Sequence, residues 1–485
     1  MTFKVPIEHL ILPNVEKIPK ISNMSSQNRN IHQFLIDSSN FTTVRILLDW
    51  TKISNDYQIL PLIIMTFFKA FTEVNGTSMN SDQINKFFEK SSVHFWSSLG
   101  ISLDCSSRYK GNLFPSVFEL GFVCDKDDIL NILDVFESLL ARSEISIETL
   151  EYIVKMMKSQ ISSQKRSGQH LLQDLVSSKL FPDSIYDKFS LFSCSKFLNS
   201  ESFSMSTTHQ KITKFISDLW KNRNDLTSIS ITSPIKFDYS FIDQITSHLH
   251  LDTVNCAPTQ LSVEPTFQDN VTLLSSPSIS SSFASIVSSG PSSFLFPNKE
   301  ALLLAIEFLV QIEGPLYSPI RGNGLAYHFD LTCDCETGTI KFDVIDSVDV
   351  TRVFDVFADV IRSIISDGRL DDVLFKSAVS SLVYSLTESH GTAFNSAFKS
   401  TFYSIKGIPV DYCHEFIHSV VAVQPDDVLR AINQWILPVI EGSRFVVCPA
   451  SAEKKYLEFF ANKKMIVETV NVVDLLGSDS DSDSD

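Results

Sequence analysis

The sequence lacks several features that would place it in a familiar class of protein. Its eight cysteines are scattered without a C-x-x-C pair, which predicts buried free thiols in a reducing compartment rather than a disulfide framework. The apolar run at residues 59–68 is too short to span a bilayer. Residues 1–13 lack the charged start, apolar stretch and cleavage site of a signal peptide. We therefore expect a cytoplasmic protein that does not act at a membrane.

Positive charge is also scarce. The chain has 40 Lys and Arg against 57 Asp and Glu, which gives a formal net charge of −17. Such a chain would repel polyphosphate, and it has no basic stripe with interleaved aromatic residues, so we expect no nucleic-acid partner. Four of the negative charges belong to the Ser-Asp alternation at residues 478–485, which we expect to form a disordered acidic tail.

The length and the apolar content predict two packed domains. A chain of 485 residues exceeds what one core usually supports, and 44% of its residues are hydrophobic, 38 of them phenylalanine. We predict an N-terminal extension (1–40), a first domain (41–258), a second domain (266–470) and the acidic tail (478–485).

The order of predicted elements repeats in the two halves. In the first half we predict strands at 44–48 and 117–123 and helices at 57–71, 127–141 and 147–161, the last with Ser146 as its N-cap. In the second half we predict strands at 283–287, 326–331 and 341–345 and helices at 298–312, 350–365 and 371–386. At an offset of about 225 residues, eight apolar positions between Ile129 and Leu150 fall on apolar positions between Phe354 and Phe375. This pattern predicts an α+β fold of two tandem homologous α/β sandwich domains, each a mostly antiparallel sheet with helices on one face.

The serine-rich stretch at residues 274–293 has two possible interpretations. Its composition is typical of a flexible linker. However, Phe283, Ser285 and Val287 alternate in the manner of a strand, which favours a strand at the start of the second domain.

The most informative stretch is the loop at residues 319–327. It places Arg321 and Tyr327 six positions apart around Gly322 and Gly324. Arginine offers a rigid pair of donors to carbonyl or carboxylate oxygens, and the glycines permit close approach to another backbone. The alternative is a surface turn in which Arg321 is solvated and Tyr327 is packed.

Three segments carry a resemblance to a known family. Residues 313–317 (E-G-P-L-Y), 321–327 (R-G-N-G-L-A-Y) and 424–430 (Q-P-D-D-V-L-R) are similar to the C-terminal half of pitrilysin/insulinase-type (inverzincin) metallopeptidases, in the branch related to presequence proteases. The resemblance implies that a last helix follows at 428–440. It also implies a non-catalytic half that closes a peptide-binding chamber, in which Arg321 would hold a substrate carbonyl and Tyr327 would donate to the oxyanion. His328 departs from the small residue common at that position.

The zinc-binding motif H-x-x-E-H of that family is absent. The nearest match, V-P-I-E-H at residues 5–9, lacks the first histidine and has a proline inside the required helical turn. We therefore expect no cofactor in this chain and no peptidase activity of the chain alone. The resemblance then implies a separate zinc-bearing chain and unfolded peptides as partners. The alternative is a degenerate scaffold that binds peptides or a partner without cleaving them.

A second metal motif occurs at residues 414–418. His414, Glu415 and His418 match the H-E-x-x-H pattern of another class of zinc hydrolase, in which the two histidines share a helix face. No recognisable third ligand follows, and the intervening residues form an apolar stripe that favours an ordinary amphipathic helix.

Overall fold

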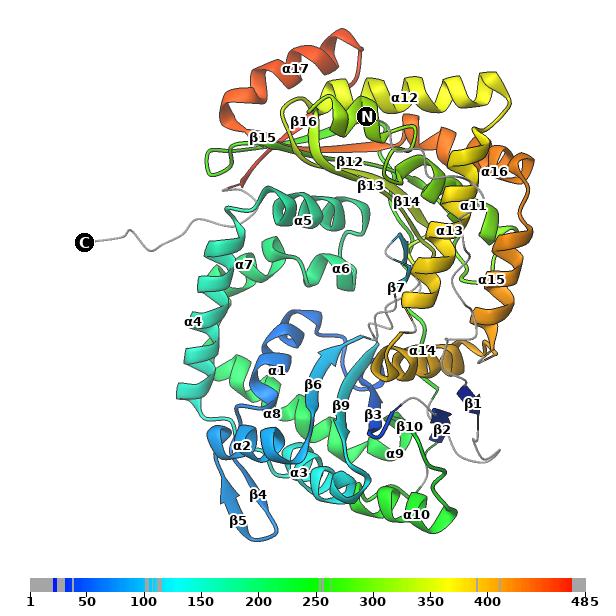
Figure 1. The fold of residues 1–485 in the computed structure, drawn as a ribbon. Helices are drawn as coiled ribbons and strands as arrows, with labels where there is room; N and C mark the ends of the chain where they lie inside the picture. Colours follow the sequence, from blue (N-terminus) through cyan, green and yellow to red (C-terminus); the bar gives the residue numbers. More distant parts are fainter. Residues whose placement is uncertain are drawn as a thin grey trace.

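The computed structural model contains a six-stranded sheet, an eight-stranded sheet and a two-stranded sheet, together with their helices (Figure 1). The two-stranded sheet is formed by β4 (Thr72–Val74) and β5 (Thr77–Met79). It describes residues 21–23, 31–36, 39–100, 104–106, 108–110, 116–252, 254, 257–261, 263–389, 391–409 and 411–472. The predicted acidic tail, the V-P-I-E-H segment and most of the predicted N-terminal extension lie outside these residues. Within them, no helix has the length and apolarity needed to cross a bilayer.

The first sheet has the strand order β1-β2-β10-β3-β9-β6. Its strands are β1 (Ile21–Asn23), β2 (Ile31–Ile36), β3 (Thr42–Asp49), β6 (His94–Leu99), β9 (Val117–Cys124) and β10 (Thr227–Ser233). One face carries the apolar side chains of β3, β9 and β10, which form a core with the helices. The other face is polar and includes Arg45, Glu119 and Ser230, all buried. Their burial requires a second layer over this face.

The second sheet has the order β16-β11-β15-β12-β14-β13-β8-β7. Its strands are β7 (Asp104–Ser106), β8 (Tyr109–Lys110), β11 (Val271–Ser276), β12 (Ser282–Ser289), β13 (Ala326–Asp334), β14 (Thr339–Ser347), β15 (Ser443–Pro449) and β16 (Val467–Asn471). The β7–β8 hairpin comes from the first half of the chain, between β6 and β9, and extends the second sheet. The serine-rich stretch forms parts of β11 and β12, so its interpretation as a strand is confirmed.

The central strands of the two sheets have the same order and the same relative directions. The order β2-β10-β3-β9-β6 corresponds to β11-β15-β12-β14-β13. In each set the first pair is parallel and the following three pairs are antiparallel. The prediction of two tandem homologous α/β domains is therefore confirmed as a fold class.

The helices lie mainly where amphipathic periodicity predicts them. In the first half they are α1 (Leu60–Phe67), α2 (Ser81–Ser91), α3 (Ile129–Ala141), α4 (Ile147–Gln164), α5 (Gly168–Leu180), α6 (Ile185–Lys188), α7 (Leu191–Asn199), α8 (Met205–Lys221), α9 (Arg223–Leu226) and α10 (Tyr239–His248). In the second half they are α11 (Lys299–Val310), α12 (Val350–Asp367), α13 (Asp372–Glu388), α14 (Ala393–Lys406), α15 (Tyr412–Ala422), α16 (Pro425–Ala431) and α17 (Glu453–Asn462). Ser146 caps α4 as predicted, with its hydroxyl accepting from the Thr149 N–H at 3.1 Å.

One helix of each domain packs against the sheet of the other domain. The first-half helix α5 packs on β12 and β15 of the second sheet, where Leu171 and Leu175 meet Phe283 and Phe445 (Figure 1). The second-half helix α14 packs on β2 and β10 of the first sheet. This exchange provides the second layer that the polar face of the first sheet requires.

Two predictions differ from the structure. The predicted boundary at residue 41 separates β1 and β2 from the domain, although β2 pairs with β10 inside the first sheet. The single last helix expected at 428–440 is instead the end of α16, a π-helical turn at 432–436 and a 3-10 turn at 437–441, and α17 and β16 follow it. Pro438, which has no N–H to continue an α-helical ladder, lies at the start of the 3-10 turn.

Candidate functional site

The loop that carries Arg321 and Tyr327 joins α11 to the edge region of the second sheet. After α11 the chain forms a π-helical turn, Ser318–Gly322, and enters β13 at Ala326. Ile320 is fully buried and anchors the turn, and its carbonyl accepts from the Leu325 N–H at 2.9 Å. Residues 321–324 are exposed. The turn therefore projects from the surface and is anchored by the buried Ile320 side chain.

Arg321 and Tyr327 lie beside each other at the surface. The Arg321 guanidinium carbon is 5.4 Å from the centre of the Tyr327 ring and 5.8 Å from that of Tyr317, which is the arrangement of a cation–π contact. Tyr327 is 68% exposed, so the alternative that packs this side chain is wrong. Arg321 makes no ion pair with any carboxylate of the described residues. Within the described structure, the guanidinium therefore contacts two aromatic rings and no carboxylate.

The two glycines of the loop differ in what they contribute. Gly324 has φ +69°, a left-handed conformation that favours glycine, and a Cβ there would meet nothing within 4 Å. A Cβ on Gly322 would make only an ordinary contact of 3.5 Å with the Ser318 hydroxyl. The backbone conformation therefore favours glycine at position 324, whereas position 322 could hold a Cβ without a clash.

Arg108 was missed by sequence reasoning. It precedes β8, and its guanidinium pairs with Glu307 of α11 and with Asp330 of β13, the latter at 3.0 Å. Burial raises the pKa of the Asp330 carboxyl, although the nearby Arg108 charge opposes that rise. The backbone of Arg108 also pairs with β13 near the end of that strand, where the Cys333 N–H donates to the Arg108 carbonyl at 2.9 Å. No local pattern signals this contact, since Arg108 and Asp330 are 222 positions apart.

The H-E-x-x-H segment lies on α15. Glu415 and His418 are exposed and His414 is half-buried. The predicted apolar stripe is buried: Cys413, Phe416, Ile417 and Val420. No three His, Cys, Asp or Glu side chains of the described residues are grouped so that they could hold a metal ion. The residues present therefore do not fit a three-ligand zinc site.

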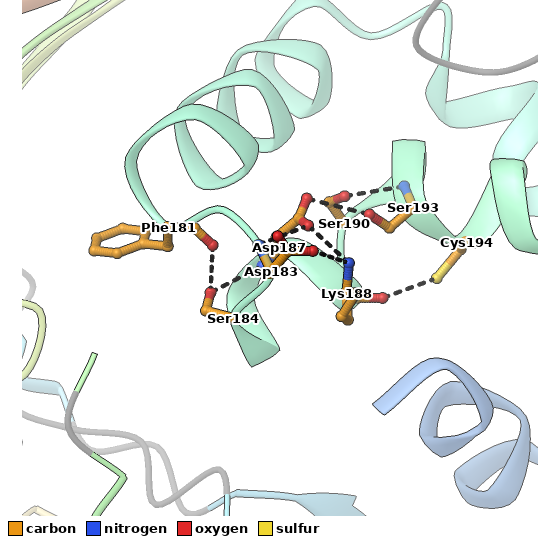
Figure 2. Close-up of polar contacts among 8 residues, drawn as sticks. All are labelled: Phe181, Asp183, Ser184, Asp187, Lys188, Ser190, Ser193 and Cys194. Atoms are coloured by element: carbon orange, nitrogen blue, oxygen red, sulfur yellow. Dashed lines mark hydrogen bonds and ion pairs between the residues drawn. The ribbon is translucent and has the colours of Figure 1, made fainter. Parts of the chain in front are cut away.

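A cavity of about 240 Å³ lies between α1, α4 and α7. Its walls are mostly apolar: Pro61, Ile64, Met65, Met157, Gln160, Ile161, Gln164, Phe189 and Cys194. Figure 2 shows Cys194 directed toward the Lys188 carbonyl oxygen, to which its thiol donates at 3.8 Å. Burial raises the pKa of Cys194 to about 12, so this thiol is not a nucleophile at neutral pH.

Comparison of the sequence with known proteins gives two yeast relatives. A Schizosaccharomyces pombe protein is 27% identical over 223 residues, and a Saccharomyces cerevisiae protein is 22% identical over 222 residues; both are described only as uncharacterised. Each match covers 44% of this chain and 21% of the relative. The matched region thus spans about a fifth of the length of these relatives. No family model matches the sequence.

Comparison of the structure gives similar folds along nearly the whole chain. An M16 peptidase inactive domain from Pseudomonas fluorescens has a TM-score of 0.65 at 13% identity, over 89% of this chain and 98% of that one. A protease from Helicobacter pylori has a TM-score of 0.63 at 9% identity, over 89% of this chain and 100% of that one. A conserved protein from Enterococcus faecalis has a TM-score of 0.68 at 12% identity, over 88% of this chain and 99% of that one. The predicted resemblance to a non-catalytic pitrilysin-type half is confirmed at the level of the fold.

Proposed function

We propose that this chain is the non-catalytic half of a two-part M16-type peptidase and binds unfolded peptide through Arg321 and Tyr327. A separate chain would supply the zinc site, because neither the sequence motif nor a ligand cluster among the described residues provides one here. The observation that carries the proposal is the exposed Arg321 guanidinium, which lies beside the Tyr317 and Tyr327 rings and has no carboxylate partner in the described structure.

The chemistry of the pair suits a peptide backbone. The guanidinium can donate two parallel hydrogen bonds to carbonyl oxygens, and the Tyr327 hydroxyl can donate one more. An extended peptide rises about 3.3 Å per residue, so carbonyls on one side recur about every 6.6 Å. The Arg321 guanidinium carbon lies 5.4 Å from the centre of the Tyr327 ring, so the two side chains are close enough to contact the backbone of one extended segment.

Affinity purification from the source cell tests the proposal. We expect a zinc-bearing chain to accompany this one, and the eluate to contain zinc and cleave an unfolded peptide. Arg321→Ala and Tyr327→Phe should each reduce cleavage by the assembled complex about tenfold to a hundredfold, since the first removes the donors that hold a substrate carbonyl and the second removes the donor to the carbonyl that gains charge during cleavage. Arg321→Lys is the matched control, because it keeps the charge but not the forked donors.

The same variants separate this proposal from the scaffold alternative. A complex that cleaves equally well with Arg321→Ala and Tyr327→Phe would identify the chain as a scaffold only. Purification of the chain without any zinc-bearing partner would contradict the two-part peptidase directly.

A further inference from the structure

A second cavity, of about 230 Å³, lies on the face of the second sheet that α12 covers. It is bounded by α12, by α17 with the residues that follow it, and by the turn at 437–441 that leads into β15. Ile286 of β12 lines this cavity, whereas its neighbour Val287 packs with α5 on the opposite face of the sheet (Figure 1). None of the lining residues belongs to the Arg321 loop.

Much of the cavity wall is apolar. Six buried apolar side chains contribute to it: Ile286, Phe354, Phe357, Ala358, Ile440 and Phe460. An apolar cavity of about 150 Å³ is large enough to hold benzene. The present cavity therefore has room for one apolar side chain together with a small polar group.

Five charged side chains line the same cavity. Lys463 pairs with Asp355, and the Arg362 guanidinium lies 3.6 Å from the Glu441 carboxylate. Arg444 is the fifth, so three positive charges stand against two negative ones. The whole chain has the opposite balance, with a net charge of −17. The cavity is therefore a local excess of positive charge, which favours an anionic ligand.

Arg444 makes no ion pair with a carboxylate in the described part of the chain. It is half-buried, and its two Nη atoms donate to the carbonyl oxygens of Ile440 and Gly442, the latter at 3.1 Å. Burial lowers the pKa of the guanidinium, although the nearby Glu441 charge opposes that shift. Because a guanidinium has five N–H donors, these two bonds leave three donors for a ligand. An anion bound there would supply the counter-charge that the two neutral carbonyls do not.

The backbone around Arg444 fixes the place of these donors. Gly442 lies against β12, where a Cβ would come within 2.4 Å of the Val287 carbonyl oxygen. Arg444 itself is paired with Ile286 in the antiparallel ladder between β15 and β12. The bonds to the turn at 437–441 then hold the guanidinium from the other end. A donor group fixed in this way loses little conformational entropy when it binds a ligand.

We propose that this cavity binds the α-carboxylate and the apolar side chain of an amino acid. The carboxylate accepts from Arg444, and the apolar side chain occupies the space beside Phe357 and Phe460. Asp355 and Glu441 also make the cavity compatible with an α-ammonium group next to the carboxylate. A free amino acid and the C-terminal residue of a peptide share this chemistry. The proposal is independent of the proposed function, because it uses neither the Arg321 loop nor a zinc-bearing partner.

Isothermal titration calorimetry of the full-length chain tests the ligand. The probes are phenylalanine, N-acetylphenylalanine and N-acetylphenylalaninamide, and for ligands of this size we expect a Kd of about 1 mM. The amide, which lacks the carboxylate charge, should bind about tenfold more weakly than the tighter of the two acids. Tighter binding of phenylalanine than of its N-acetyl derivative would identify a free amino acid as the ligand, and the reverse would identify a peptide C-terminus. Equal binding of the amide, or no saturable binding up to about 10 mM, would overturn the proposal.

Substitutions in the cavity test the site. Arg444→Met keeps the aliphatic stem but removes the guanidinium, and should weaken binding of the tighter acid about tenfold. Lys463→Gln removes a more exposed charge and should weaken binding about threefold. Lys454→Gln is its matched control, because Lys454 lies on α17 outside the cavity, is 89% exposed, and gives the same change in net charge. If Arg444→Met does not fold, the comparison of the two lysine variants decides, and equal binding by them would contradict the site.

Discussion

The buried ion pair between Arg45 and Glu119 gives the sharpest stability prediction. Both side chains are 1% exposed, and the Arg45 Nε donates to the Glu119 Oε1 at 2.6 Å. Arg45 also donates to the Phe398 carbonyl at 3.3 Å and stacks on the Phe398 ring at 3.9 Å, while its Nη2 has no partner in the described structure. Glu119→Ala therefore leaves a buried guanidinium without its counter-charge, which costs about 3–5 kcal/mol of unfolding free energy.

Urea unfolding followed by tryptophan fluorescence measures this cost. Glu119→Gln is the matched control, because it keeps the volume and one acceptor and should be less destabilising than Glu119→Ala. The double variant Arg45→Met with Glu119→Leu should be clearly more stable than Glu119→Ala, since it removes both charges together. A loss below about 1 kcal/mol for Glu119→Ala would show that the guanidinium finds water or another partner, and would refute the reasoning.

Three further predictions concern local chemistry. Ser146→Ala should cost about 1 kcal/mol in the same unfolding assay because it removes the α4 cap, whereas Ser159→Ala on the exposed side of that helix should cost almost nothing. Burial works to raise the pKa of Asp349, but hydrogen bonds from Lys455 and from the start of α12 lower it overall, so its contribution to stability is present above about pH 4 and is lost as the pH falls through the lowered pKa. Asp349→Asn keeps the cap and should flatten that part of the stability–pH curve; an unchanged curve would contradict this assignment. Cys194 should resist iodoacetamide at pH 8 in the folded chain and react readily in urea, because burial raises its pKa to about 12.

Helices were the most predictable part of the fold. The periodicity of residues 350–365 predicted α12, and its apolar positions Phe354, Phe357 and Ile361 are indeed buried. The hydrophobic periodicity that identifies an amphipathic helix is complete within a few turns of its own sequence. The strand β10, T-S-I-S-I-T-S, was not predicted although it alternates, and the burial of its serine and threonine face depends on α14, which is distant in the sequence.

The site was predictable only where one segment holds all of it. Arg321 and Tyr327 belong to one short loop, so sequence spacing sufficed to bring them together. The partners of Arg108 and the pairing of Arg45 with Glu119 depend on which strands become neighbours, and sequence periodicity does not determine that. The H-E-x-x-H segment shows the opposite case: its local spacing is correct, but the described structure brings no third ligand to it.

The placement of α14 explains why the polar face of the first sheet can be buried at all. The Thr401 and Ser230 hydroxyls lie 2.7 Å apart, and the Ser404 hydroxyl lies 2.6 Å from the His32 Nδ1, so α14 satisfies groups that the first domain cannot satisfy itself. The same helix places the Phe394 ring 5.4 Å from the Trp96 ring of β6. A fragment that ends near residue 258 would lose these partners and expose Arg45 and Glu119 to water.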